Sequence, residues 1–147
     1  MSRLPPRSAE PRVWIAFSGR ADLLWQRLLC PGFRHCFAAL ADPQGWTVVD
    51  PLAGRVVVER LAVAPDFDLP EFWRRAGFRV LGPFIPAPPR RRLLPLVAPF
   101  TCVTVCLRLL GREESLVLTP RGLYRRLAVC LATSDRKKVL TPKPPAA

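Results

Sequence analysis

The stretch Pro99–Gly111, PFTCVTVCLRLLG, decides how the rest of the chain is arranged. It predicts a short apolar helix with Cys102 in its first turn, since a proline precedes the periodic residues and a glycine follows them. At about 100° per residue, Thr104 and Arg108 share one side. The opposite, broad arc holds Cys102, Val103, Val105, Cys106, Leu107, Leu109 and Leu110. We therefore expect Cys102 to face the body of the protein.

The position of Cys102 in this helix suggests a nucleophile. The positive end of the helix dipole and the unpaired N–H groups of a first turn favour the thiolate form of a cysteine. The alternative is that Cys102 is a small buried hydrophobic residue, as free cysteine often is. The helix alone leaves both interpretations open.

Composition sets the size and the charge of the protein. A chain of 147 residues, half of them hydrophobic, is long enough for one domain with a real core. The 23 Lys and Arg against 11 Asp and Glu give a net charge of +12, which favours a polyanion as partner. The one tight basic run, Arg90, Arg91 and Arg92, is the candidate anion-binding segment. A GC-rich genome would also produce an excess of arginine and the 18 prolines of this chain.

Cysteine usage predicts a protein without a disulfide framework. Five cysteines without a CxxC pair indicate a reducing compartment, and we expect a cytoplasmic protein. A metal site from Cys36, Cys102, Cys106 and His35 is the alternative, but Cys36 and His35 should point to opposite faces of a strand. We expect neither metal nor cofactor. The N-terminal MSRLPPRSAEPR is no secretory signal, and no apolar run reaches the ~18 residues of a membrane span.

Periodicity and turn residues predict an α+β fold, with a small antiparallel sheet of about four to five strands packed against the cysteine-bearing helix. Residues 1–11 are expected to form a flexible arm, 12–131 a single domain and 132–147 a disordered basic tail. The expected strands are Arg12–Phe17, Phe33–Leu40, Trp46–Leu52, Arg55–Val63 and Phe78–Ile85. The other expected helices are Ala21–Leu29, one within Asp66–Ala76 beginning near Asp68, and one that Thr119-Pro120 begins and that ends near Leu131.

The only histidine, His35, lies near the start of one expected strand, and Asp50 lies near the end of the next. A hairpin turn centred between Asp42 and Pro43 makes His35 and Asp50 direct cross-strand neighbours, with Cβ atoms about 5 Å apart. A carboxylate there would fix the imidazole and stabilise its charged form. The structural alternatives are a lone core histidine and an Asp-Pro pair that begins a turn.

Three short motifs carry a resemblance to a known family: FRHC with His35, VVDP with Asp50, and PFTCV with Cys102. Over roughly Val13–Gly111 the chain resembles the circularly permuted papain-like cysteine hydrolases, the NlpC-like hydrolases and the lecithin retinol acyltransferase relatives. There the histidine strand precedes the cysteine helix. The resemblance implies a permuted papain-like fold, thiol hydrolase activity, and a peptide, lipid or cell-wall substrate.

Together these residues predict a cysteine hydrolase or acyltransferase acting on an amide, ester or thioester. Cys102 would attack the carbonyl, His35 would move the proton and Asp50 would orient the ring. The backbone N–H of Cys102 would stabilise the oxyanion, with Ser18 as a weaker candidate for a second donor. A cell-wall peptidase or amidase encoded by a phage or prophage would suit the small size and basic charge.

The competing hypothesis is a catalytically inactive basic interaction protein. It would be a virion component or a binder of nucleic acid or another anionic surface, using its arginines on phosphates. In this protein, unlike several members of the family, Val103, Thr104 and Val105 follow the cysteine in place of acidic or polar residues. That departure is the reason to keep the inactive alternative, with a virion-associated location in place of a cytoplasmic one.

Overall fold

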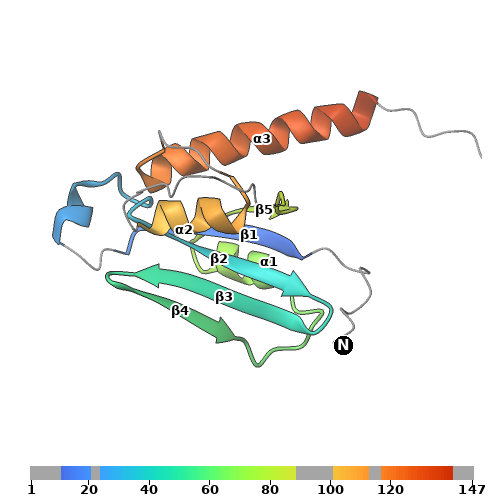
Figure 1. The fold of residues 1–147 in the computed structure, drawn as a ribbon, viewed down its shortest axis with the longest axis horizontal. Helices are drawn as coiled ribbons and strands as arrows, with labels where there is room; N and C mark the ends of the chain where they lie inside the picture. Colours follow the sequence, from blue (N-terminus) through green and yellow to red (C-terminus); the bar gives the residue numbers. More distant parts are fainter. Residues whose placement is uncertain (1–10, 21–23, 89–100, 113–116, 141–147) are drawn as a thin grey trace, which may run out of the picture.

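A computed structural model describes residues 11–20, 24–88, 101–112 and 117–140 (Figure 1). It is an α+β fold with a five-stranded antiparallel sheet, as the sequence predicts. The strands are β1 (Arg12–Ser18), β2 (His35–Asp42), β3 (Gly45–Leu52), β4 (Arg55–Arg60) and β5 (Arg79–Phe84). Their order across the sheet is β4-β3-β2-β1-β5. The helices are η1 (Leu24–Leu28), a 3-10 helix, and α1 (Leu69–Arg75), α2 (Cys102–Leu109) and α3 (Pro120–Leu140).

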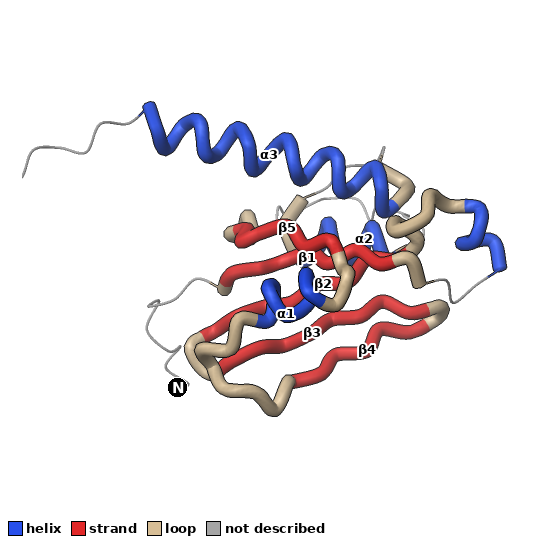
Figure 2. Tube along the Cα trace, turned by 180° about the vertical axis from the view of Figure 1, so that it is seen from behind, coloured by secondary structure: helices blue, strands red, loops and turns tan. Residues whose placement is uncertain are grey.

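Helices cover both faces of the sheet. Figures 1 and 2 show α2 and α3 on one face and α1 on the other. Side chains alternate along β1 and β2, so each face has its own hydrophobic cluster. The cluster under α2 and α3 includes Ile15, Phe17, Cys36, Ala38, Val103, Cys106, Leu107, Leu123 and Leu127. The cluster under α1 includes Ala16, Ala39, Trp46, Leu69, Trp73 and Val80. The cysteine-bearing helix therefore packs on the sheet by the face that the sequence predicts.

The contribution of α3 to this core can be measured. Leu123 is fully buried under α3, and we expect Leu123→Ala to lower the free energy of unfolding by about 2–5 kcal/mol because it leaves a cavity. Leu118, 69 % exposed just before the helix, is the matched control, and Leu118→Ala should change stability by less than about 0.5 kcal/mol. Urea unfolding followed by tryptophan fluorescence measures both. Equal effects of the two substitutions would contradict the packing of α3.

The β2–β3 hairpin corrects the predicted register by two residues. The ladder runs from Asp42↔Gly45 to Ala38↔Val49, so the turn is Pro43-Gln44 and not Asp42-Pro43. Asp42 causes the difference, because its carboxylate accepts a hydrogen bond from the Gln44 N–H at 2.8 Å and closes the turn. Asp50 therefore lies one step diagonally from His35 and not directly opposite. A shift of two residues keeps both side chains on the same face of the sheet.

Two other predictions are wrong at their boundaries. In the described part of the expected helix Ala21–Leu29, the structure has the short 3-10 helix η1 in place of an α-helix, and Leu24 and Leu28 are 80 % and 90 % exposed. The last helix continues to Leu140, so residues 132–140, expected in the disordered tail, are helical. Those residues contain good helix formers and no glycine or proline before Pro142.

Several expectations fall outside the described residues. These are the flexible arm up to residue 10, the anion-binding run Arg90, Arg91 and Arg92, and the end of the tail after residue 140. Within the described residues, no helix combines the length and the apolar character that crossing a membrane requires. The remaining elements lie within a few residues of their predicted bounds.

Candidate active site

A capping box fixes the start of α2. Thr101 has extended backbone angles, and its Oγ1 accepts a hydrogen bond from the Thr104 N–H at 3.2 Å. In return, the Thr104 hydroxyl accepts a hydrogen bond from the Thr101 N–H at 2.9 Å. This arrangement makes Cys102 the first residue of the helix, where N–H groups have no acceptor within the helix. The sequence prediction of a cysteine in a first helical turn is confirmed.

His35 lies where β2 and β3 stop pairing. Beyond Ala38↔Val49, the first residues of β2 pair with β1 and the last residues of β3 pair with β4. The imidazole bridges these two strand ends: its Nε2 lies 2.6 Å from Oδ1 of Asp50. The His35 side chain is 4 % exposed and that of Asp50 is 29 % exposed. Phe37 stacks on the ring at a centroid distance of 6.1 Å, which holds its plane.

The thiol of Cys102 completes the group. It lies close enough to the His35 ring and to the thiol of Cys36 for both groups to shift its pKa, so α2 and β2 bring sulfur and imidazole together. Because Asp50 engages Nε2, Nδ1 is the ring nitrogen that remains for the sulfur. Cys102, His35 and Asp50, which the sequence singled out, are therefore grouped at one place in the fold.

The contacts favour a charged pair of thiolate and imidazolium. The hydrogen bond from Cys36, opposed by burial and supported by the hydrogen bond from His35, lowers the pKa of Cys102 from 9.0 to about 5. Burial opposes the charged form of His35, but its hydrogen bonds to Asp50 and Cys102 raise its pKa from 6.5 to about 10. Between these values the sulfur is negative and the ring positive. This is the state in which a cysteine acts as a nucleophile.

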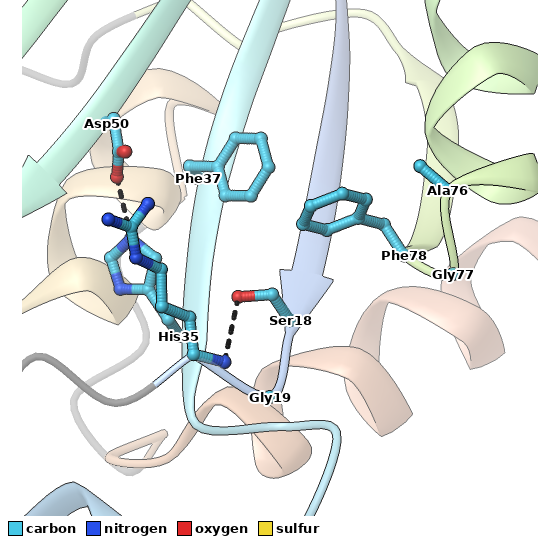
Figure 3. A pocket seen from close by; sticks show the side chains of 9 residues that line it. Ser18, Gly19, His35, Phe37, Asp50, Ala76, Gly77 and Phe78 are labelled. Carbon is cyan, nitrogen blue, oxygen red and sulfur yellow. Dashed lines mark hydrogen bonds and ion pairs between the residues drawn. The ribbon is translucent and has the colours of Figure 1, made fainter.

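A pocket of about 340 Å³ opens beside His35 on the α1 face of the sheet. Figure 3 shows the Asp50 carboxylate directed at the imidazole, with Phe37 and Phe78 along the pocket. Cys102, on α2, does not line it. The pocket lining comprises Ser18, Gly19, Arg20, His35, Phe37, Asp50, Ala76, Gly77 and Phe78. His35 therefore contacts a pocket on one face of the sheet and the half-buried Cys102 on the other.

The two predicted oxyanion donors, the backbone N–H of Cys102 and Ser18, lie in different parts of the site. The backbone N–H of Cys102 is in the first turn of α2, where such a donor is expected. Ser18 pairs with His35 across the β1–β2 ladder and lines the pocket. Its Oγ accepts a hydrogen bond from the Arg20 N–H at 3.4 Å. Its role as a second donor stays a prediction.

The sequence missed the contact between Cys36 and Cys102. It correctly placed Cys36 on the face opposite His35, where the thiol is now found in the core under α2. The alternation along β2 was the available signal, since it directs Cys36 toward whichever helix covers that face. Among the described residues, no three or more His, Cys, Asp or Glu side chains form a group that could hold a metal ion.

Because His35 is the only histidine, its charge can be followed as a single imidazole signal by proton NMR. We expect this signal to titrate near pH 10 in the native protein. Asp50→Asn should lower the pKa of His35, since a neutral amide no longer stabilises the imidazolium. Asp42→Asn is the control, because Asp42 is an exposed carboxylate bonded to Arg60 at the other end of β2. Titration near pH 6.5 in the native protein would contradict the ion pair.

Comparisons with protein-family models, with curated proteins and with solved structures found no match to this chain. The chemical interpretation therefore depends on the geometry described above.

Proposed function

We propose that this protein is a cysteine hydrolase or acyltransferase that acts on an amide, ester or thioester carbonyl, with the permuted papain-like arrangement of its catalytic residues. The observation that carries the proposal is the grouping of Cys102, His35 and Asp50: Nε2 of His35 lies 2.6 Å from Oδ1 of Asp50, and the Cys102 thiol lies close enough to the ring for each to shift the pKa of the other. The histidine strand precedes the cysteine helix in the chain, which is the order of the permuted enzymes that the sequence resembles.

The first half-reaction follows from the charged pair. The Cys102 thiolate attacks the carbonyl carbon, a C–S bond forms, and the carbonyl oxygen becomes an oxyanion near the first-turn N–H groups of α2. The His35 imidazolium then gives its Nδ1 proton to the leaving nitrogen, oxygen or sulfur. The bond to the leaving group breaks, and an acyl group remains on the sulfur as a thioester.

The second half-reaction reverses the proton transfer. Neutral His35 takes a proton from water, or from an acceptor hydroxyl or amine, which attacks the thioester carbon. The Cys102 thiolate leaves and the ion pair is restored. Asp50 contributes by holding the ring through the 2.6 Å contact and by stabilising its positive charge. The substrate is a peptide, a lipid or a cell-wall fragment.

Trapping the acyl-enzyme tests the proposal directly. We expect the protein, incubated with p-nitrophenyl acyl esters or acyl thioesters, to gain one acyl group on the tryptic peptide 93–108, which contains Cys102. Hydroxylamine should remove the group, because thioesters are labile to it. Tandem mass spectrometry distinguishes Cys102 from Cys106 on that peptide. A folded protein that is acylated only elsewhere would overturn the proposal and leave the basic interaction protein as the better hypothesis.

Five free cysteines suit a reducing compartment, and we place the protein in the cytoplasm as part of the same proposal.

A further inference from the structure

Three thiols lie on the α2 side of the sheet. Cys36 on β2 and Cys106 on α2 belong to one buried cluster, and Cys102 packs against it. Cys36 lies close enough to both other cysteines for them to raise its pKa, and Cys102 and Cys106 are one helical turn apart. Cys36 and Cys106 are fully buried, whereas Cys102 is half-buried. The proposed hydrolytic mechanism uses the thiol of Cys102 alone. The placement of a second thiol against the proposed nucleophile has no role in that mechanism.

We propose that Cys36 is the resolving thiol for oxidation of Cys102, and that a hydroperoxide converts the pair into a reversible Cys36–Cys102 disulfide. In the first step the Cys102 thiolate attacks the terminal peroxide oxygen, the O–O bond breaks, and Cys102 becomes a sulfenic acid with release of hydroxide or alkoxide. In the second step the Cys36 sulfur attacks the sulfenic sulfur. The S–S bond forms, and the hydroxyl leaves with the Cys36 proton as water.

Burial sets the order of these steps. Cys36 is shielded from a dissolved oxidant, and burial together with its hydrogen bonds to Cys102 and Cys106 raises the pKa of its thiol. The first oxidation therefore takes place at Cys102, which is the more exposed and more acidic thiol. A buried thiol held beside the sulfenic acid then has a high effective concentration for the second step.

Cys36 is also the better partner on geometric grounds. Cys102 packs against the buried cluster that contains Cys36, and their thiols lie close enough for each to shift the pKa of the other. A disulfide requires that these two sulfurs approach to about 2.05 Å. Cys102 and Cys106 belong to the same helix, where the capping box and the buried Val103 and Leu107 hold the backbone. Formation of the disulfide would remove the nucleophile and protect it from irreversible oxidation. That regulatory consequence rests on the proposed function, whereas the disulfide chemistry does not.

Peptide mapping of the full-length protein tests the inference. The reduced protein is treated with a small excess of hydrogen peroxide, alkylated and digested with trypsin without reduction. We expect the peptides 35–55 and 93–108 to be found joined, with the loss of two hydrogen atoms, in the native protein and in Cys106→Ala. Dithiothreitol should then restore alkylation of Cys102.

The variant Cys36→Ala supplies the decisive comparison, with Cys106→Ala as a control of equal burial and equal change in volume. Without the resolving thiol, we expect about tenfold more of the oxidised Cys102 to be sulfinic and sulfonic acid than in Cys106→Ala. The variants are compared at equal loss of the Cys102 thiol, because removal of Cys36 also raises the pKa of Cys102 and slows its first oxidation. Thermal unfolding checks that both variants fold. Equal overoxidation of the native protein and Cys36→Ala, or a cross-link that persists in Cys102→Ser, would overturn the inference. A disulfide that forms in a protein without acyl-enzyme would instead contradict only the proposed function.

Discussion

Cys102→Ser is expected to lower turnover of an activated ester or thioester by about 10⁴-fold or more. Serine keeps the size of the side chain and the helix start that Thr101 and Thr104 cap. Its hydroxyl is far less acidic than the thiol whose pKa is lowered to about 5, so no anionic nucleophile forms at neutral pH. The loss should be in kcat and in kcat/KM together, because attack by sulfur is the first chemical step.

Cys130→Ala is the matched control for this substitution. Cys130 is a half-buried cysteine on α3 that contacts the Arg112 guanidinium at 3.0 Å. Its removal should leave turnover within about twofold, since it has no part in the mechanism. Circular dichroism and thermal unfolding verify the fold of both variants. Turnover of Cys102→Ser within tenfold of the native protein would show that another group performs the chemistry.

The sequence was sufficient to predict the components of the site, because each one has a local signal. A proline before the periodic residues and a glycine after them predict the helix that begins at Cys102, and the structure adds Thr101 as its cap. Alternation places His35 and Asp50 on one face of a hairpin. The prediction of their contact survived an error of two residues in register, since an even shift does not change the face of the sheet. An error of one residue would have separated them.

The remaining features depend on packing that no local pattern records. The β2–β3 ladder ends at Ala38↔Val49, and the imidazole of His35 lies beyond this end. The ladder ends there because β2 continues to pair with β1, and β3 with β4. The proximity of Cys36 and Cys102 depends on where along β2 the helix α2 packs. The length of α3 is a boundary problem, because residues 132–140 suit a helix and a basic tail equally well by composition.

His35→Gln is expected to raise the pH at which Cys102 becomes reactive. In the native protein the rate of alkylation by iodoacetamide should rise through a midpoint near pH 5, the pKa of Cys102. At pH 6 the reaction should be on the order of tenfold faster than that of an ordinary thiol, since the larger thiolate fraction outweighs the lower nucleophilicity of an acidic thiol. Removing the imidazolium removes a positive charge beside the sulfur, and the midpoint should move upward toward 9.0.

The variant Cys36→Ala separates the two causes of this acidity. The hydrogen bond from Cys36 is the largest contribution to the low pKa of Cys102, so its loss should also raise the alkylation midpoint. The imidazolium persists in that variant, and turnover should still fall at high pH as His35 loses its proton near pH 10. In His35→Gln that alkaline limb should be absent along with most of the turnover. A native midpoint near 9.0 would show that sulfur and imidazole are not a charged pair, and the thiol would then be the small buried hydrophobic residue of the alternative interpretation.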